Sequence, residues 1–362
     1  MKKKILILCP FPRGQAAGQR LKYEQYFEYW EKEGYEITLS SFSDLRLWKV
    51  LYKEGYFLRK AFGGLRGYLR RIRDLFFLNK FDLVYIFMWV TPYGSTFFER
   101  IVRQFSKKVI YDFDDSIHLD NTKEEFSISN IFKGNKKSNY LIRSSDHVII
   151  SSPFHFDYCI DLNKKQKCTY IPCSLDTARF KIKPENEPKE KVVIGWTGTF
   201  SSIMYLDTLK DVLKELSLKN DFLLKIIGNF NYSLEGVDLE VIQWTKENEI
   251  NDLHSFDIGI YPLIEDQWAL GKGALKAMQY MAIGIPTVAT NYGTNPQVID
   301  QGINGFLVNS KEEWLDKLEH LILNPEERTR IGLNAREKIE RNYSVESLKG
   351  TYLEVFKDSE DS

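Results

Sequence analysis

The chain has 362 residues, 43% of them apolar, with 50 basic and 50 acidic side chains. This length allows two domains that each bury a core, and the apolar share is typical of a soluble globular protein. No apolar run approaches the roughly 18 to 20 residues that a membrane-spanning helix needs, so we exclude such a helix.

The zero net charge hides a difference between the two halves of the chain. Residues 1–180 carry 30 basic and 20 acidic side chains, and residues 181–362 carry 20 and 30. The halves are therefore about +10 and −10, as expected of two domains with different partners. The four cysteines form no Cys-x-x-Cys pair, which favours reduced thiols in a cytoplasmic protein.

The first apolar run, 5–9, follows three lysines and is ended early by prolines. It is too short for the core of a signal peptide, so we expect a first buried strand. The next loop contains Arg13, Gly18 and Arg20, and a single helix is expected from there to Gly34. A cationic, glycine-bearing loop at the carboxyl end of a strand can contact a ligand; an ordinary strand–helix turn is the alternative.

Residues 46–80 mix arginine and lysine with leucine, phenylalanine, tyrosine and tryptophan. Helices of this composition have a cationic face and an apolar face, which suits the surface of an anionic membrane. A helix pair packed on the core, with its charges in solvent, is an equal alternative. We expect no nucleic-acid partner, because no nucleic-acid-binding motif accompanies the basic residues.

A group of carboxylates follows the expected buried strand at 109–111. Asp112, Asp114 and Asp115 come first, and His118 follows them closely. Such carboxylates can bind a metal ion or cap the next helix. No histidine or carboxylate at metal-ligand spacing occurs elsewhere, so we expect no metal.

A polar, proline-bearing stretch, 181–191, is the expected linker to a second domain. That domain opens with a strand and a loop containing Gly198 and Thr199, whose backbone N–H groups can contact phosphate. The absence of Gly-x-Gly-x-x-Gly argues against a dinucleotide-reducing enzyme. Trp244, at the end of a later strand, can cover a nucleotide base or pack beneath its loop.

The most specific pattern lies at 255–308. An apolar strand at 257–261, a polar loop, a helix at about 273–283 and a strand at 287–289 predict one unit of a parallel sheet. Its helix places Lys272, Lys276 and Gln279 at i, i+4 and i+7, on one face.

Two lysines at a helix N-terminus favour a diphosphate site. Unpaired N–H groups and the positive end of the helix dipole are concentrated there. Gly271 and Gly273, on either side of Lys272, let a ligand approach the backbone closely. A solvated helix face is the alternative, and the position after a parallel strand favours the ligand site.

This segment resembles the donor-binding signature of family 4 retaining glycosyltransferases, in particular a subgroup that reads G-K-x-x-x-K-x-x-Q-Y-M-A-x-G-x-P. The resemblance implies an α/β protein of two Rossmann-like domains facing across a cleft, the GT-B arrangement. Residues 1–180 would form the acceptor-binding domain and 191–344 the domain that binds the nucleotide-sugar donor. The C-terminal helix, 345–362, would pack back on the first domain.

Two glutamates eight residues apart are common in this family, and Gly271 and Gln279 occupy their positions here. The resemblance assigns sugar-ring contact to the first position and ribose hydroxyl binding to the second. Gln279 can still form a hydrogen bond to a hydroxyl without a charge. Glu265 or Asp266, in the preceding loop, is the candidate to replace the missing first acid.

On the acceptor side, the resemblance is carried by the run Y-D-F-D-D at 111–115. The family's corresponding strand often ends in His-Asp facing the acceptor, and Asp114 would take the place of that histidine near the reacting sugar. Arg20 would assist it. The remaining acceptor-side candidates are Arg13, Gly18 and His118.

The implied reaction is transfer of a sugar, with retention, from a nucleoside diphosphate sugar to a glycan or lipid-linked acceptor. Lys272 and Lys276 would meet the charge of the leaving diphosphate, without a metal or other cofactor. Bacterial surface polysaccharide or lipopolysaccharide synthesis, at the cytoplasmic face of the membrane, is the implied setting. A nucleotide-sugar epimerase and a non-catalytic, membrane-docked nucleotide-sugar-binding partner remain as alternatives.

Overall fold

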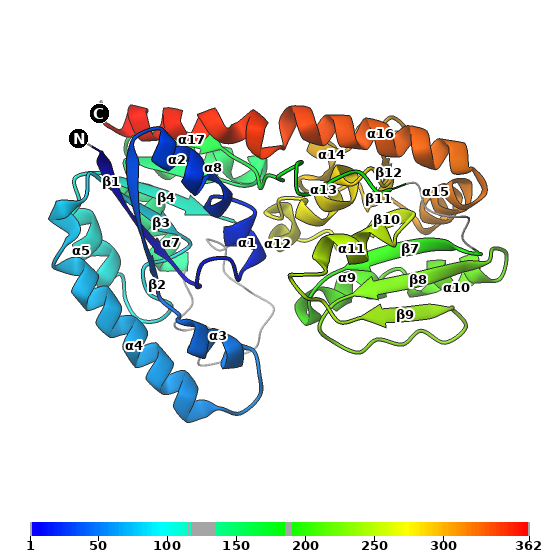
Figure 1. Cartoon of the computed structure of the whole chain (residues 1–362), viewed down its shortest axis with the longest axis horizontal. Helices are drawn as coiled ribbons and strands as arrows, with labels where there is room; N and C mark the ends of the chain where they lie inside the picture. The colour runs from blue at the N-terminus through cyan, green and yellow to red at the C-terminus, as the bar shows by residue number, and fades with distance from the viewer. Residues whose placement is uncertain (1, 115, 117–134, 185–189, 361–362) are drawn as a thin grey trace. The chain divides into compact units, whose positions relative to one another are not determined.

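The computed structural model describes residues 2–114, 116, 135–184 and 190–360 (Figure 1). It divides into two compact units. Unit 1 contains Met1–Ser174 and Leu348–Ser362, and unit 2 contains Leu175–Ser347. The sequence analysis placed the corresponding boundaries at 180 and 344. In the part of the chain that the structure describes, none of the helices has the length and apolarity that a bilayer crossing requires.

Unit 1 contains a six-stranded sheet in the order β2-β1-β3-β4-β5-β6, in which every neighbouring pair is parallel. Apolar residues fill most of these strands, as expected for a parallel sheet with both faces covered. The strands are β1 (Lys3–Cys9), β2 (Tyr35–Ser41), β3 (Leu83–Phe87), β4 (Val109–Phe113), β5 (His147–Ile150) and β6 (Cys168–Tyr170).

Helices cover both faces of this sheet. Alternate side chains such as Val84 and Ile86 join one apolar cluster with α5 (Phe97–Phe105), α7 (Asn135–Ser144) and α8 (Phe156–Leu162). Tyr85 points to the opposite face, where its ring lies 6.3 Å from that of Trp30. This alternation follows from the two-residue period of a strand.

The C-terminal helix α17 (Val345–Glu360) completes the second face of unit 1. Its Phe356 ring lies 4.8 Å from Trp30 and 5.5 Å from Tyr35, in edge-on geometry. Tyr352 lies 4.9 Å from Tyr26. The last helix therefore supplies part of the aromatic core over the first strands.

The prediction of a single helix after β1 is wrong. The chain forms three short pieces instead: α1 (Ala17–Arg20), the 3-10 turn η1 (Glu24–Tyr26) and α2 (Phe27–Lys32). The break lets the buried Lys22 ammonium reach the Asp112 carboxylate on β4. A buried ion pair thus sets the course of this segment.

The segment 46–80 forms two helices, α3 (Leu45–Leu51) and α4 (Phe57–Leu75), followed by the 3-10 turn η2 (Leu78–Lys80). Asp44 caps α3, since its side chain accepts a hydrogen bond from the Leu47 amide. Figure 1 shows α4 as the long blue helix of unit 1.

Unit 2 contains a second six-stranded parallel sheet, in the order β12-β11-β10-β7-β8-β9. Its apolar core joins one face of the sheet to α10 (Lys210–Ser217) and α15 (Lys311–Leu323). The strands are β7 (Val192–Thr197), β8 (Phe222–Ile227), β9 (Leu239–Ile242), β10 (Ile258–Tyr261), β11 (Thr287–Thr290) and β12 (Phe306–Val308).

The opposite face of the unit 2 sheet is covered by α13 (Leu275–Ala282), which also packs against α16 (Pro325–Asn342). Gly259 on β10 permits this close approach, because a Cβ atom there would lie 2.4 Å from the Tyr280 ring. The remaining short helices are η4 (Phe200–Ser202), α9 (Ile203–Asp207), α11 (Glu249–His254), α12 (Gln267–Leu270) and α14 (Asn295–Val298).

Candidate functional site

The loops that follow β7, β10 and β11 share one edge of the unit 2 sheet, because these strands are parallel neighbours. Two of the loops are joined by hydrogen bonds. The Leu263 amide donates to Thr290 Oγ1 at 2.9 Å, and Tyr292 Oη donates to the Asp266 carbonyl at 3.2 Å. The sheet edge therefore has a defined loop framework.

Asp266 begins the short helix α12 in this framework. Its carboxylate accepts a hydrogen bond of 2.7 Å from the Ala269 amide, in the position of an N-cap. Asp266 thus has a structural role, which leaves Glu265 as the exposed carboxylate of the two.

The structure corrects the predicted position of Lys272. The helix begins at Leu275 rather than at about 273, so Lys272 lies in the loop between α12 and α13 and not on a helical face with Lys276. Ala274 precedes the helix with φ of 54°, in the left-handed region that alanine rarely adopts. Such strained backbone is found most often at functional sites.

Lys276, in the first turn of α13, is held by the loop after β7. Its ammonium donates to Ser202 Oγ at 3.1 Å and lies 4.6 Å from the centroid of the Trp196 ring. The Tyr261 ring, at the end of β10, is 5.9 Å away. Aromatic faces stabilise a partly desolvated cation, so this ammonium is held at the sheet edge.

Lys272 approaches the same loop region by a different route. Its ammonium lies 5.3 Å from the centroid of the Tyr205 ring, which belongs to α9. Within the described residues, no carboxylate lies at ion-pair distance from Lys272. The structure therefore directs both lysines toward the segment that begins with β7.

Three backbone N–H groups near Gly198 form hydrogen bonds within unit 2. The Thr197 amide donates to Tyr280 Oη at 2.9 Å, the Gly198 amide to the Ile227 carbonyl at 3.0 Å, and the Thr199 amide to Ser202 Oγ at 3.0 Å. These three donors serve the fold, so phosphate binding by backbone N–H groups around Gly198 stays a prediction. The Thr197 bond fixes α13 beside the end of β7.

The other donor-side candidates differ in how far they are buried. Gln279 is buried in α13, Gly271 is buried at the end of α12, and Gly273 is half-buried. Trp244 is half-buried and follows β9, the edge strand, which β8 separates from β7. The structure thus groups the two lysines more closely with the β7 loop than with Trp244.

In unit 1, the loop after β1 is organised by two polar side chains that the sequence analysis did not single out. Gln19 accepts a hydrogen bond from the Phe11 amide at 2.9 Å and donates to Glu24 at 3.1 Å. Glu24 also accepts from the Gly14 amide at 2.7 Å. Both side chains are buried, so the loop has a fixed conformation.

This loop brings Gly18 against Asp114. A Cβ atom on Gly18 would lie only 2.5 Å from Asp114 Oδ2, so only glycine lets the carboxylate occupy this place. Arg20, two residues after Gly18, is buried. Arg13 is exposed, and its guanidinium carbon lies 4.9 Å from the centroid of the Phe27 ring. His118 falls outside the described residues.

Asp112 is the structural member of the aspartate group. Its carboxylate is fully buried and binds both the Lys22 ammonium and the Tyr85 hydroxyl. Burial raises the pKa of Asp112, while Lys22 and Tyr85 oppose that shift. Among the described residues, no group of three His, Cys, Asp or Glu side chains is arranged to hold a metal ion.

Part of the chain matches a known protein family. The sequence model described as "Glycosyl transferases group 1" matches residues 178–338, which include both lysines. Residues 178–338, somewhat less than half of the chain, are thus similar to the group 1 glycosyltransferases. The resemblance on which the sequence analysis relied is thereby confirmed.

Two curated relatives match this chain at low identity. Spore coat protein SA of Bacillus subtilis is 24% identical over 205 residues, which are 49% of this chain and 52% of the relative. The match thus spans about half the length of that relative. An uncharacterized 41.2 kDa protein in the cps region of Klebsiella pneumoniae is 26% identical over 256 residues, 65% of this chain and 67% of the relative.

Solved structures support the fold of this chain. Sucrose-phosphate synthase of Thermosynechococcus elongatus aligns with a TM-score of 0.74 and 14% identity, over 99% of this chain and 98% of that one. Anabaena Alr3699/HepE in complex with UDP-glucose aligns with a TM-score of 0.66 and 16% identity, over 98% and 99%. The expected two Rossmann-like domains are confirmed.

Proposed function

We propose that this chain transfers a sugar from a nucleoside diphosphate sugar, and that the donor binds at the β7–β10–β11 edge of unit 2. The observation that supports this proposal is the pair of lysines aimed at the β7 loop. Lys276 is fixed by Ser202 and the Trp196 ring, and Lys272 lies over Tyr205. Ligands of open parallel sheets bind at this edge.

The proposed chemistry needs positive charge where the diphosphate leaves. Negative charge grows on the leaving phosphate as the bond to the sugar breaks, and groups already fixed in place stabilise it most. Lys276 meets this requirement because two neighbours hold its ammonium. The positive end of the α13 dipole adds to its effect.

A uridine nucleotide is the first donor to test. The support is that Anabaena Alr3699/HepE, which has the same fold, was solved in complex with UDP-glucose. Gln279 is our candidate for a nucleotide hydroxyl, Glu265 for the sugar ring, and Trp244 for the base. In this proposal no metal or other cofactor is needed, since the lysines supply the positive charge.

Asp114, with Arg20 and Gly18, is our candidate for the acceptor side in unit 1. We propose retention at the anomeric carbon, with the departing phosphate taking the acceptor's proton, so that no strong general base is needed. A glycan or lipid-linked acceptor of bacterial surface polysaccharide synthesis fits the Klebsiella relative from a cps region.

A thermal-shift screen followed by turnover assays tests the donor proposal. The full chain is expected to show a higher Tm with UDP and with one UDP-sugar, because a ligand that binds the folded state stabilises it. A sugar-transfer product formed with an added acceptor supports a transferase. A changed free sugar without acceptor favours an epimerase, binding without any turnover favours a non-catalytic partner, and no binding to any nucleotide sugar contradicts the proposal.

The Gly18→Ala variant tests the acceptor side. The new methyl group would displace the Asp114 carboxylate, so we expect kcat/KM to fall about 10- to 100-fold, as small misplacements near reacting groups do. The melting temperature should change little, since the displaced atom is the end of a side chain. Gly350→Ala is the matched control, because a Cβ atom there meets open space. Unchanged activity of Gly18→Ala would remove this contact from the mechanism.

A further inference from the structure

We propose that the outer face of α4 docks on an anionic lipid membrane surface. The face is a single row of large apolar side chains, between 43% and 77% exposed. Their spacing of four, three, four, three and four residues places them on one side of the helix. The members of this outer stripe are Leu58, Phe62, Leu65, Leu69 and Ile72 on α4, and Phe76 at its C-cap.

The buried residues of α4 are two glycines and a charged pair, Gly63, Gly67, Arg71 and Asp74, the reverse of an ordinary surface helix with an apolar inner face. A Cβ atom on Gly63 would lie 2.8 Å from Leu47 of α3, and one on Gly67 would lie 2.7 Å from the Phe42 ring. The helix backbone therefore packs directly on its neighbours. No large side chain of the outer stripe can replace a glycine on this inner face.

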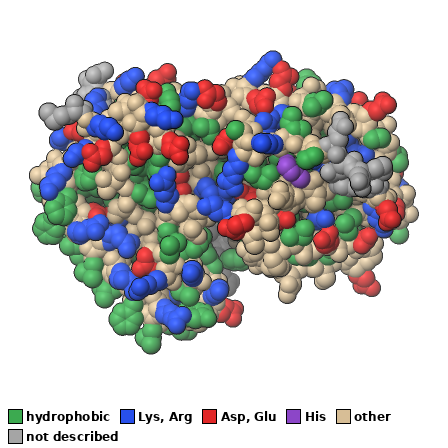
Figure 2. Space-filling model, viewed as in Figure 1, with side chains coloured by type: hydrophobic (Ala, Val, Ile, Leu, Met, Phe, Trp, Pro, Cys, Tyr) green, Lys and Arg blue, Asp and Glu red, His purple; other side chains and the backbone are tan. Residues whose placement is uncertain are grey.

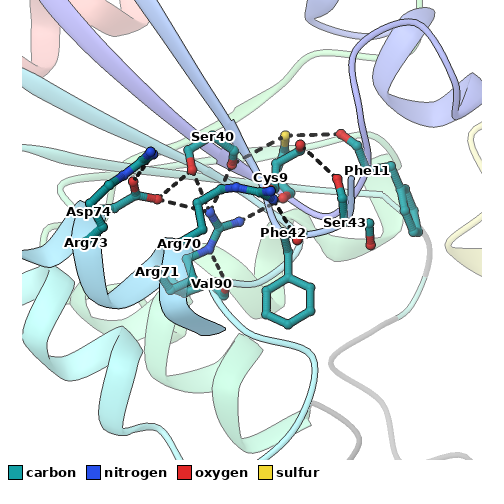
Figure 3. A network of polar contacts seen from close by, with 11 residues as sticks. Cys9, Phe11, Ser40, Phe42, Ser43, Arg70, Arg71, Arg73, Asp74 and Val90 are labelled. Atoms are coloured by element: carbon teal, nitrogen blue, oxygen red, sulfur yellow. Dashed lines mark hydrogen bonds and ion pairs between the residues drawn. The ribbon is translucent and has the colours of Figure 1, made fainter. Parts of the chain in front are cut away.

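A polar network fixes the helix in this orientation (Figure 3). The buried Arg71 guanidinium donates to the carbonyls of Val90, Ser40 and Cys9 at 2.7, 3.0 and 2.8 Å. It also pairs with Asp74 at 3.3 Å. Because these partners lie at the ends of β1 and β2 and in the loop after β3, α4 is attached to the sheet through its polar side.

The charge around the outer stripe is positive. Residues 45–80 contain ten basic and two acidic side chains, and one of those acids is the buried Asp74. Arg59, Arg66 and Arg73 recur every seven residues along one flank of the stripe. Arg66 pairs with Asp44 and Arg73 with Asp74, each at 3.0 Å, so their net contribution is smaller than that of Arg59.

The positive charge around the outer stripe favours an anionic membrane over a second copy of the chain. The seven-residue spacing also suits a coiled coil, but a second copy would bring the same arginines and no exposed acid along the stripe. An anionic bilayer instead offers phosphate groups to the arginines and acyl chains to the leucines and phenylalanines. Figure 2 shows hydrophobic and basic side chains intermixed over the region of α3 and α4.

The apolar surface extends beyond α4. Tyr93 and Phe97 are both more than half exposed, and Tyr68 of α4 donates a hydrogen bond of 3.0 Å to the Tyr93 carbonyl. The loop after β3 and the start of α5 therefore adjoin the helix. An amphipathic helix on a rigid domain would lie in the plane of the interface.

Vesicle flotation with the full chain tests this proposal. Vesicles of phosphatidylcholine with phosphatidylglycerol are expected to bind the chain at least tenfold more than vesicles of phosphatidylcholine alone, and added salt should weaken the binding. Leu65→Gln with Leu69→Gln should lower binding at least tenfold. Leu218→Gln, at a leucine that is 85% exposed in unit 2, is the matched control and should bind normally.

Several results would overturn the proposal. Equal binding to neutral vesicles, or full binding by the double variant, would remove the role of α4. Self-association in sedimentation experiments that the double variant abolishes, without lipid binding, would assign the stripe to a second copy. Nucleotide binding and melting temperature, measured on the same variants, should be unchanged, so that failure here is distinct from failure of the proposed reaction.

Discussion

Lys276→Ala is expected to lower kcat/KM for sugar transfer about 100- to 1,000-fold, the range typical for loss of one fixed charge-stabilising group. The lost ammonium is held between Ser202 and the Trp196 ring, so no other side chain takes its place without rearrangement. The melting temperature should remain close to that of the wild type. Steady-state kinetics with the donor found by the thermal-shift screen give the measurement.

Two companion variants make this result specific. Lys219→Ala removes a lysine of the same unit whose side chain is 62% exposed, and its activity should be unchanged. Lys276→Arg retains the charge but changes its geometry, so partial activity is expected. If Lys276→Ala turns over at near wild-type rate, Lys276 has no part in the chemistry.

Arg71→Met is expected to cost about 3 to 5 kcal/mol of unfolding free energy, as is typical when one partner of a buried charged network is removed. The substitution removes the guanidinium donor from the carbonyls of Val90 and Cys9, although the Phe42 amide still donates to Cys9, and it weakens the attachment of α4 to the sheet. Urea unfolding followed by circular dichroism measures the loss. The midpoint should fall without a large change in m.

Arg73→Met is the matched control for Arg71. Arg73 also pairs with Asp74, at 3.0 Å, but its side chain is 64% exposed. Solvent screens such a pair, so the expected loss is below about 1 kcal/mol. Equal losses for the two variants would contradict the special role of the buried guanidinium.

Much of the fold was predictable because parallel strands buried on both faces give short apolar runs. The apolar runs at 5–9 and 257–261 correspond to β1 and β10. Their alternation with helices indicates two parallel sheets, and the lysine-bearing pattern at 271–286 indicates the family.

The errors arose where tertiary contacts override local pattern. Lys272 has helical spacing to Lys276, but Ala274 adopts a left-handed backbone that the sequence does not signal. The segment 17–32 has a helical pattern, but the buried contact of Lys22 with Asp112 interrupts it. Asp266 is different, since an aspartate before a helical segment is a recognisable cap.

Sequence pattern also left the orientation of α4 open. An amphipathic helix normally turns its apolar side inward, so composition alone fits a packed helix as well as a membrane-facing one. The orientation of the helix follows from Gly63 and Gly67, which the structure places in contact with Leu47 and Phe42. Spacing of the glycines is visible in the sequence, but their neighbours are not.

The origin of unit 1 from both ends of the chain has a consequence for biosynthesis. Trp30 and Tyr35 are synthesised before unit 2, whereas Phe356, which packs against both rings, is synthesised after it. During translation of the whole of unit 2, this aromatic face stays uncovered on the nascent polypeptide. We therefore expect nascent chains on the ribosome to expose an aromatic surface to which chaperones can bind.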